Sequence, residues 1–286
     1  MMRSHHFLLC NCIISVAARI GYGRGMDYGL KGARAFVAAA SAGIGRACAE
    51  ALVAEGARVV ISARDRERLE RARAELSAGG GEVHAIAADL AGAEAATAVE
   101  RAIALLGGLD VLVVNGGGPP PGRFDSLDDA TWSRALEGTL LSTVRMVRAA
   151  EKALMASGRG RIVVIASTSV KAPIDGLLLS NSIRLGVVGL CKTLSIELAP
   201  SGITVNVVCP GMTDTDRIRE LDRVQAAGRG RPVEEVAAER VRSIPLGRLA
   251  RPSEIAAAVA FLASSAAGYV TGVALAVDGG LVRFPL

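Results

Sequence analysis

Apolar runs of strand length alternate with amphipathic stretches of helix length over most of the chain, from Arg34 to Val277. The runs predict strands over Arg34–Ala40, Arg58–Ser62, Glu82–Ala87, Val111–Asn115, Arg161–Ile165, Ile203–Val208 and Ala274–Val277. The stretches between them predict helices over Gly43–Glu55, Arg66–Ser77, Ala93–Leu106, Thr131–Ser157, Leu178–Leu198 and Pro252–Ala263. This alternation is typical of a doubly wound α/β fold, in which right-handed crossovers place helices on both faces of the sheet. We therefore expect one α/β domain with a seven-stranded, mainly parallel sheet.

The composition fits such a domain and excludes other classes of protein. Of 286 residues, 51% are hydrophobic, which suffices for a buried parallel sheet. The net charge of +5 is spread along the chain and only 3% of residues are aromatic, so we expect no nucleic-acid surface. The cysteines form no C-x-x-C pair, which argues against a disulfide framework or a metal site and favours a reducing compartment. They are Cys10, Cys12, Cys48, Cys191 and Cys209.

The first 25 residues stand apart from the alternating pattern. Their apolar stretch, Phe7–Ala18, faintly resembles a signal peptide, but it is too short to span a bilayer and precedes no A-x-A cleavage site. We interpret residues 1–25 as an extension outside the fold and residues 26–286 as the folded domain. A cytoplasmic protein without a membrane segment is the expectation.

One segment breaks the alternation after the sixth predicted strand. Residues 213–248 are polar and rich in arginine, and they are too long for an ordinary connection. Because long segments in compact domains often cover ligands, we interpret 213–248 as a helical lid over a substrate site. A surface insertion without regular structure is the alternative.

A glycine-containing turn, Ala38–Gly45, follows the first predicted strand. Glycines there let the backbone approach a pyrophosphate, and the free amides and dipole of the next helix attract phosphate groups. A lone G-x-G also serves close packing of a helix on a strand. Arg64, after the second predicted strand, favours a dinucleotide, since an arginine at this place suits the 2′-phosphate of NADP and a carboxylate suits NAD. The alternative is that Arg64 caps a surface turn.

The order of motifs resembles the short-chain dehydrogenase/reductase family, and within it the 3-oxoacyl-[acyl-carrier-protein] reductases. The turn resembles the family's T-G-x-x-x-G-x-G with alanine at its first two positions, Val114–Gly117 resembles N-N-A-G, and Asp278–Gly280 resembles D-G-G. The resemblance implies a Rossmann-type domain that binds NADP(H), with NAD(H) as the alternative. The cofactor residues that it implies are Ser41, Gly43, Ile44, Gly45, Arg64, Asp89, Leu90, Asn115, Gly116, Gly117, Arg184, Pro210, Gly211, Thr213 and Thr215.

The family's reaction uses an Asn, Ser, Tyr and Lys set, and the resemblance assigns each a position here. Thr139 stands at the asparagine position, seven residues after Trp132, and Ser167 keeps the serine. Ser180 stands at the tyrosine position and Arg184 at the lysine position. A tyrosine with a lowered pKa donates a proton after hydride delivery, whereas a serine hydroxyl is a much poorer acid. Arg184 keeps the positive charge but cannot pass a proton on, and Ser167 can still bind a substrate oxygen.

No other tyrosine or histidine is placed to supply the proton. Tyr22 and Tyr28 precede the first strand, Tyr269 lies near the last, and His84 lies within the third. The remaining candidate is Lys171, in the loop after the fifth strand, because desolvation lowers the pKa of a lysine towards neutrality. An exposed loop lysine is the alternative.

Three hypotheses for the function follow. The first is an NADPH-dependent oxidoreductase that acts on a carbonyl or alcohol, or on an acyl thioester. The second is a nucleotide-binding protein without redox turnover, as a sensor or inactive subunit, and the third is dehydration or isomerisation with Lys171 as base. The resemblance also implies a homotetramer or homodimer, built partly by Thr131–Ser157 and Leu178–Leu198. The composition and the lack of a spanning apolar run indicate no nucleic-acid or membrane partner.

Overall fold

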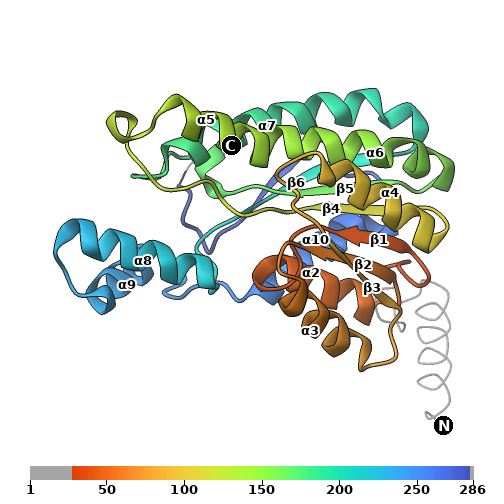
Figure 1. Cartoon of the computed structure of the whole chain (residues 1–286), viewed down its shortest axis with the longest axis horizontal. Helices are drawn as coiled ribbons and strands as arrows, with labels where there is room; N and C mark the ends of the chain where they lie inside the picture. The colour runs from red at the N-terminus through yellow and green to blue at the C-terminus, as the bar shows by residue number, and fades with distance from the viewer. Residues whose placement is uncertain (1–27, 284–286) are drawn as a thin grey trace, which may run out of the picture.

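A parallel sheet is the central layer of the molecule (Figure 1). The computed structural model describes residues 28–283, with one seven-stranded sheet in the order β3-β2-β1-β4-β5-β6-β7. The strands are β1 (Arg34–Val37), β2 (Arg58–Ala63), β3 (Val83–Ala87), β4 (Val111–Val114), β5 (Arg161–Ile165), β6 (Thr204–Pro210) and β7 (Ala274–Val277). All pairs of neighbouring strands in this sheet are parallel. The predicted doubly wound α/β fold is confirmed, and the sheet is wholly rather than mainly parallel.

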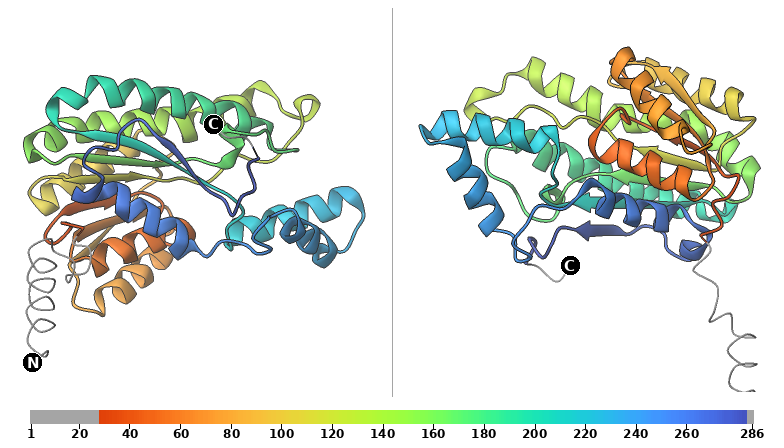
Figure 2. Two further views of the ribbon diagram at one scale, coloured as in Figure 1. Left: turned by 180° about the vertical axis from the view of Figure 1, so that it is seen from behind. Right: turned by 90° about the horizontal axis from the view of Figure 1, so that it is seen from below.

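Helices cover both faces of the sheet (Figure 2). One face carries α2 (Gly43–Ala54), α3 (Arg66–Ser77) and α10 (Pro252–Ala263), and the other carries α4 (Glu94–Leu106), α6 (Ser142–Ser157) and α7 (Leu178–Glu197). The strand order reverses between β1 and β4, because the chain first builds outward to β3 and then returns to the other side of β1. In open parallel sheets, ligands bind at such a reversal, beyond the carboxyl ends of the strands.

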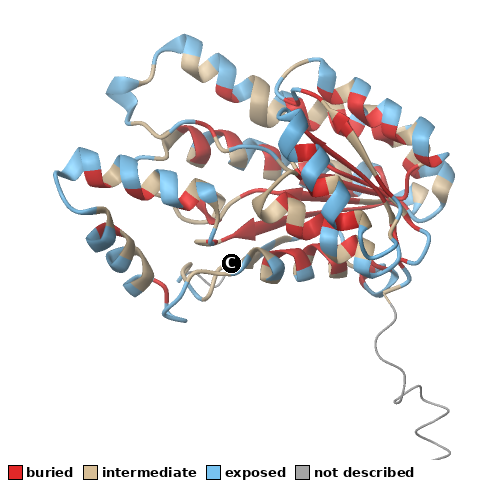
Figure 3. Cartoon of the chain, turned by 60° about the horizontal axis from the view of Figure 1, so that its bottom comes forward, coloured by how far each residue is buried: buried red, intermediate tan, exposed pale blue. Residues whose placement is uncertain are grey.

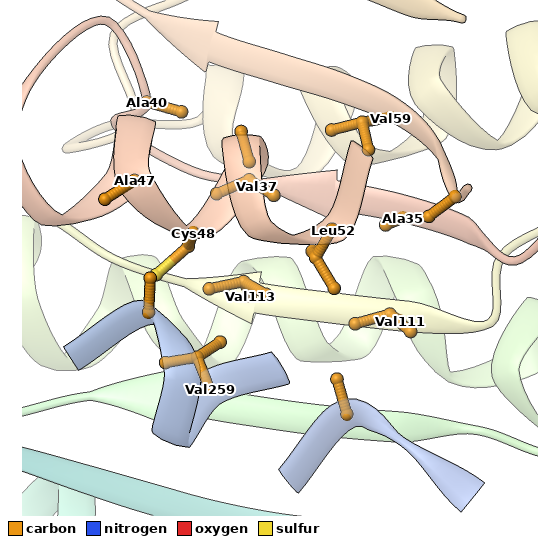
Figure 4. Packing of buried hydrophobic residues seen from close by; sticks show 14 of the residues in the cluster. Ala35, Val37, Ala40, Ala47, Cys48, Leu52, Val59, Val111, Val113 and Val259 are labelled. Carbon is orange, nitrogen blue, oxygen red and sulfur yellow. The ribbon is translucent and has the colours of Figure 1, made fainter. Parts of the chain in front are cut away.

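Successive side chains along each strand point alternately to the two faces of the sheet and pack into two separate hydrophobic cores. In β1, Ala35 and Val37 belong to the core beneath α2 and α10, whereas Phe36 belongs to the core beneath α4 and α6. Figure 4 shows Cys48 and Leu52 of α2 where this helix packs against α10 and the strands. Leu52 is fully buried, which stabilises the fold by about 1.5–3 kcal/mol. Burial on both faces explains why the strands are continuous apolar runs in the sequence.

The helix predicted over Thr131–Ser157 is confirmed as helical structure, but it is not an α-helix throughout. The chain instead forms α5 (Asp129–Leu136), a π-helical turn at Glu137–Leu141, and then α6. Asp128 starts α5 two residues earlier than predicted, because its carboxylate accepts a hydrogen bond from the backbone N–H of Thr131 at 2.8 Å. A π turn has a longer hydrogen-bonded repeat than an α-helix, so it offsets the side chains that follow.

The segment 213–248 folds mainly as two helices, α8 (Asp216–Arg229) and α9 (Val233–Arg242), which lie beside the sheet rather than against it (Figure 1). Most of their residues are exposed or half-buried (Figure 3). A buried ion pair joins them, with Arg240 Nε 2.6 Å from Asp222 Oδ1. The segment is therefore regular structure, and its role as a lid stays a prediction.

The predicted extension, residues 1–25, lies outside the described residues. Within residues 28–283, no helix combines the length and the hydropathy needed to cross a membrane. The same part of the chain contains no group of three or more His, Cys, Asp or Glu side chains arranged to hold a metal ion.

Candidate functional site

The turn after β1 contains residues with a left-handed backbone conformation and one glycine, Gly45, beside which there is no room for a Cβ atom. Strand β1 ends at Val37, not at Ala40 as predicted, because Ala39 adopts φ +49° and turns the chain out of the sheet. Gly43 also has a positive φ, +55°. A Cβ on Gly45 would lie 2.7 Å from Asn115 Nδ2 and still closer to the carbonyl oxygen of Ala39. The backbone is therefore packed as tightly as a pyrophosphate-binding turn requires.

Helix α2 begins directly at this turn with its first amides uncapped. No side chain accepts a hydrogen bond at its N-cap, Ala42, and its first turn contains no acidic residue. Asn115, at the end of β4, donates from Nδ2 to the carbonyl of Ala39 at 3.2 Å and holds the turn in place. The positive end of the helix dipole and its free N–H groups thus face the reversal of strand order, where they suit an anionic group.

A cavity of about 460 Å³ extends from the turn across the ends of β2 and β3. Arg64 lines it, is exposed, and makes no hydrogen bond or ion pair within residues 28–283. The neighbouring carboxylate of Asp65 instead caps α3 by accepting from Arg68 N at 3.0 Å. We call this space the adenosine-side cavity. The predicted cofactor residues that line it are Ser41, Arg64, Asp89, Leu90, Asn115, Gly116 and Gly117.

A second cavity of about 370 Å³ lies beyond the ends of β4, β5 and β6, and we call it the catalytic-side cavity. It shares the lining residues 115–119 with the adenosine-side cavity, so the two cavities adjoin there. The structure thus brings together side chains far apart in the sequence. The predicted site residues that line it are Gly43, Ile44, Asn115, Gly116, Gly117, Ser167, Ser180, Arg184, Pro210, Gly211, Thr213 and Thr215.

The guanidinium of Arg184 supplies a positive charge to the catalytic-side cavity. Its Nη1 donates to the carbonyl oxygens of Ile165 at 3.1 Å and Ala166 at 3.0 Å, at the end of β5. Burial, aided by the nearby charge of Arg217, lowers the pKa of Arg184 to about 10. This pKa still lies well above neutrality, so Arg184 remains charged.

Two hydroxyls of the predicted set also reach this cavity. Ser167 caps a 3-10 turn at Thr168–Val170, and its Oγ accepts from the backbone N–H of Ser169 at 3.1 Å. Ser180, on α7, has its Oγ 3.1 Å from the Oγ of Ser169. The sequence interpretation did not include Ser169. Its only signal in the sequence was a run of three hydroxyl residues, 167–169, after a predicted strand.

The structure does not bring Thr139 or Lys171 into the catalytic-side cavity. Thr139 lies in the π turn and lines the adenosine-side cavity and a small pocket that Arg184 also lines. Lys171 lines neither cavity, and its charge acts on Cys209. Burial raises the pKa of the Cys209 thiol to about 11, against the opposing effect of Lys171. The described residues that line the catalytic-side cavity include no Tyr, His, Lys or Cys.

A third cavity of about 570 Å³ lies between α8, α9 and the loop after β5. It shares Thr168, Ile174 and Met212 with the catalytic-side cavity. Arg240 lines it, donating to Asp222 and, from Nη2, to Gln225 Oε1 at 3.1 Å. An extended ligand therefore has room beneath the two helices, next to the catalytic-side cavity.

Known proteins are similar to this chain over most of its length. A family model described as enoyl-(acyl carrier protein) reductase matches residues 38–282. The chain is 37% identical over 251 residues to the 3-oxoacyl-[acyl-carrier-protein] reductase FabG of Escherichia coli, which covers 88% of this chain and 98% of that protein.

Two solved structures are similar along nearly their whole length. The L-sorbose reductase from Gluconobacter frateurii, complexed with NADPH and L-sorbose, has a TM-score of 0.86 at 30% identity, covering 91% of this chain and 100% of that one. A variant of actinorhodin polyketide ketoreductase with NADPH has a TM-score of 0.84 at 36% identity, covering 87% and 97%. With the parallel sheet, the glycine turn and these matches, the chain belongs to the short-chain dehydrogenase/reductase family.

Proposed function

We propose that this protein is an NADP(H)-dependent oxidoreductase that acts on a carbonyl or alcohol group. The observation that carries the proposal is that the two cavities adjoin at residues 115–119, so that the glycine turn lies next to a pocket lined by Ser167, Ser180 and Arg184. Two similar proteins of known structure contain NADPH, and relatives are named as 3-oxoacyl or ketoacyl reductases. A ketone, an alcohol or an acyl thioester is therefore the proposed class of substrate.

The residues of the adenosine-side cavity fit a nicotinamide dinucleotide. The amides after Gly43 would hold the pyrophosphate, Asp89 would contact the adenine, and Arg64 would pair with the 2′-phosphate that distinguishes NADP from NAD. Arg64 favours NADP(H) over NAD(H) because no acid of this chain is bonded to it within residues 28–283. When bound, the cofactor would supply the hydride.

The catalytic-side residues would bind and polarise the substrate rather than protonate it. Ser167 would donate a hydrogen bond to the substrate oxygen, and the charge of Arg184 would stabilise the negative charge that develops there. Ser180 would stand where the family has tyrosine. Loss of a positioned general acid costs about 100- to 10,000-fold in rate. We therefore propose a slow reductase whose proton comes from water.

The helices α8 and α9 are proposed as the lid of this site. Two hydrogen bonds hold the N-terminus of α8 to segments on the other side of the catalytic-side cavity. Arg68 of α3 donates to Asp216 at 2.7 Å, and Arg217 donates to the carbonyl of Pro119 at 2.8 Å. Both contacts lie on the border of the catalytic-side cavity. A ligand that enters beneath the helices would have to pass these two hydrogen bonds or break them.

Exposed apolar side chains on α7 support the proposal of a homodimer or homotetramer. Leu185 is 55% exposed and Ile196 is 68% exposed. Large apolar side chains on one helix are typical of a surface that another subunit covers. Light scattering of the purified chain would measure the assembly.

NADPH oxidation by the full chain, followed at 340 nm against a panel of ketones, sugars and 3-oxoacyl thioesters, tests the function. We expect slow turnover that Ser167→Ala abolishes. Arg64→Ala should raise the KM for NADPH about 10- to 100-fold and leave that for NADH unchanged, because a lost charge-assisted bond costs about 1.5–3 kcal/mol. Arg66→Ala, an exposed neighbour outside the cavity, is the matched control. Tight NADPH binding without turnover on any substrate would instead favour a non-redox nucleotide-binding protein.

A further inference from the structure

A pair of buried hydroxyl groups lies at the edge of the catalytic-side cavity. Ser180 lines this cavity, whereas Ser169, in the 3-10 turn after β5, does not. Their Oγ atoms are 3.1 Å apart, and the two residues are 7% and 3% exposed. The proposed function assigns no role to Ser169.

The number of available acceptors decides which hydroxyl donates. Each serine hydroxyl has a single hydrogen. In the part of the chain that the structure describes, Ser169 Oγ has one hydrogen-bond partner, Ser180 Oγ, and Ser169 borders none of the three cavities. If Ser180 donated, the hydrogen of Ser169 would be buried without an acceptor, which is unfavourable. Ser169 therefore donates, and the hydrogen of Ser180 is free to point into the cavity.

The surroundings of Ser180 are positively charged. Arg184 follows one turn later on α7 and is held by the carbonyls at the end of β5. Arg217 also lines the cavity but is paired with Glu220 at 3.1 Å, and Asp216, the carboxylate there, is paired with Arg68, so Arg184 supplies the positive charge. A fixed donor beside a positive charge stabilises an oxygen that becomes negative during a reaction.

We propose that Ser169 is a positioning residue that fixes Ser180 as a hydrogen-bond donor into the catalytic-side cavity, so that the site stabilises a negatively charged oxygen. The identity of that oxygen, the carbonyl oxygen of a reduced substrate, rests on the proposed function. The direction of the hydrogen bond does not depend on it.

Neutron diffraction from crystals of the full chain grown in D2O tests the direction of the bond. We expect the deuterium of Ser169 on the line between the two Oγ atoms and that of Ser180 directed into the cavity. A deuterium of Ser180 on that line would overturn the proposal.

Binding of 4-nitrophenol, followed by the absorbance of its phenolate as the pH is varied, tests the preference for an anion without turnover. We expect the full chain to bind phenolate in preference to phenol. Ser180→Ala and Ser169→Ala should each weaken phenolate binding about tenfold, the loss of one bond to a charged acceptor. The double variant should be no weaker than either single one, because the hydroxyls act as a unit.

Two further variants separate positioning from a merely structural role. Ser169→Thr retains a hydroxyl and should restore phenolate binding. Ser195→Ala removes another buried hydroxyl at the far end of α7, which donates only to the carbonyl of Lys192 at 2.7 Å, and should change nothing. Phenolate binding that is weak in the wild type, insensitive to Ser169→Ala, or equally sensitive to Ser195→Ala would overturn the proposal.

The experiments distinguish a failure of the proposed reductase function from a failure of the proposed role of Ser169. If no carbonyl substrate is reduced but the neutron and phenolate results hold, the hydroxyl pair stands and the proposed function falls. If a substrate is reduced, Ser169→Ala should lower kcat about 100-fold with KM unchanged, as expected for a lost oxyanion donor. A rise in KM with kcat unchanged would count against the proposal.

Discussion

Replacement of Ala39 by glycine should stabilise the protein, which is unusual for an alanine-to-glycine change. Ala39 is the one non-glycine residue with positive φ among residues 28–283, at +49°. This conformation costs an L-amino acid about 1–2 kcal/mol. Glycine removes that cost, but its greater conformational freedom in the unfolded chain lowers the free energy of unfolding by about 0.4–1 kcal/mol. The free energy of unfolding should therefore rise by about 0.5–1 kcal/mol, which raises Tm by about 1–4 °C in a domain of this size.

Thermal unfolding followed by circular dichroism measures this shift, with Ala38→Gly as the matched control. Ala38 is fully buried and has no positive φ. Its replacement should cost about 0.5–1 kcal/mol and lower Tm. If Ala39→Gly lowered Tm as much as Ala38→Gly does, the turn would not store the strain that its backbone indicates, and the reasoning would be refuted.

Three other changes probe the fold and the turn. Gly45→Ala should abolish NADPH binding measured by fluorescence, since the added Cβ meets the carbonyl oxygen of Ala39. Burial raises the pKa of Asp110, but bonds to two arginines outweigh it and lower the pKa to about 2. The bonds of Asp110 to Arg34 and Arg159 stabilise the fold above about pH 4, and this stabilisation is lost as the pH falls towards 2. Urea unfolding of Asp110→Asn should therefore show about 2 kcal/mol less stability at pH 7 and a smaller loss of stability between about pH 4 and pH 2. Burial raises the pKa of the described cysteine thiols to about 11 or 12, so iodoacetamide with peptide mapping should leave Cys48, Cys191 and Cys209 unmodified until the chain is unfolded.

The strands could be predicted because each lies between two layers of helices and is apolar on both faces. The predicted and observed bounds agree at Arg161–Ile165 and Ala274–Val277 and differ by a few residues elsewhere. The break near Glu137–Leu141 could not be predicted, since one extra residue in a helical turn leaves the apolar pattern on each side intact. The end of β1 was missed because alanine gives no sequence signal for a left-handed φ.

The candidate site was predictable as far as it depends on strand ends. Ser167 follows β5 and Arg184 lies on the next helix, so the topology alone brings them to one edge of the sheet. Side-chain direction was not predictable. Ser169 turns inward to Ser180 while Lys171 does not enter the cavity, and both follow from a single 3-10 turn, Thr168–Val170, which the sequence does not reveal.

We propose that Ser180 and Arg184, which the resemblance places at the family's tyrosine and lysine positions, act as one unit. A lysine beside a tyrosine lowers the pKa of the phenol, and without the phenol that role disappears. In the same buried place, a lysine would lose its charge readily, whereas Arg184 keeps its own with a pKa of about 10 and is held by the carbonyls of Ile165 and Ala166. A serine donor needs such a permanent charge next to it, because it stabilises an anion without neutralising it. On this proposal, Ser180 and Arg184 stabilise a negative charge in the catalytic-side cavity rather than donate a proton to it.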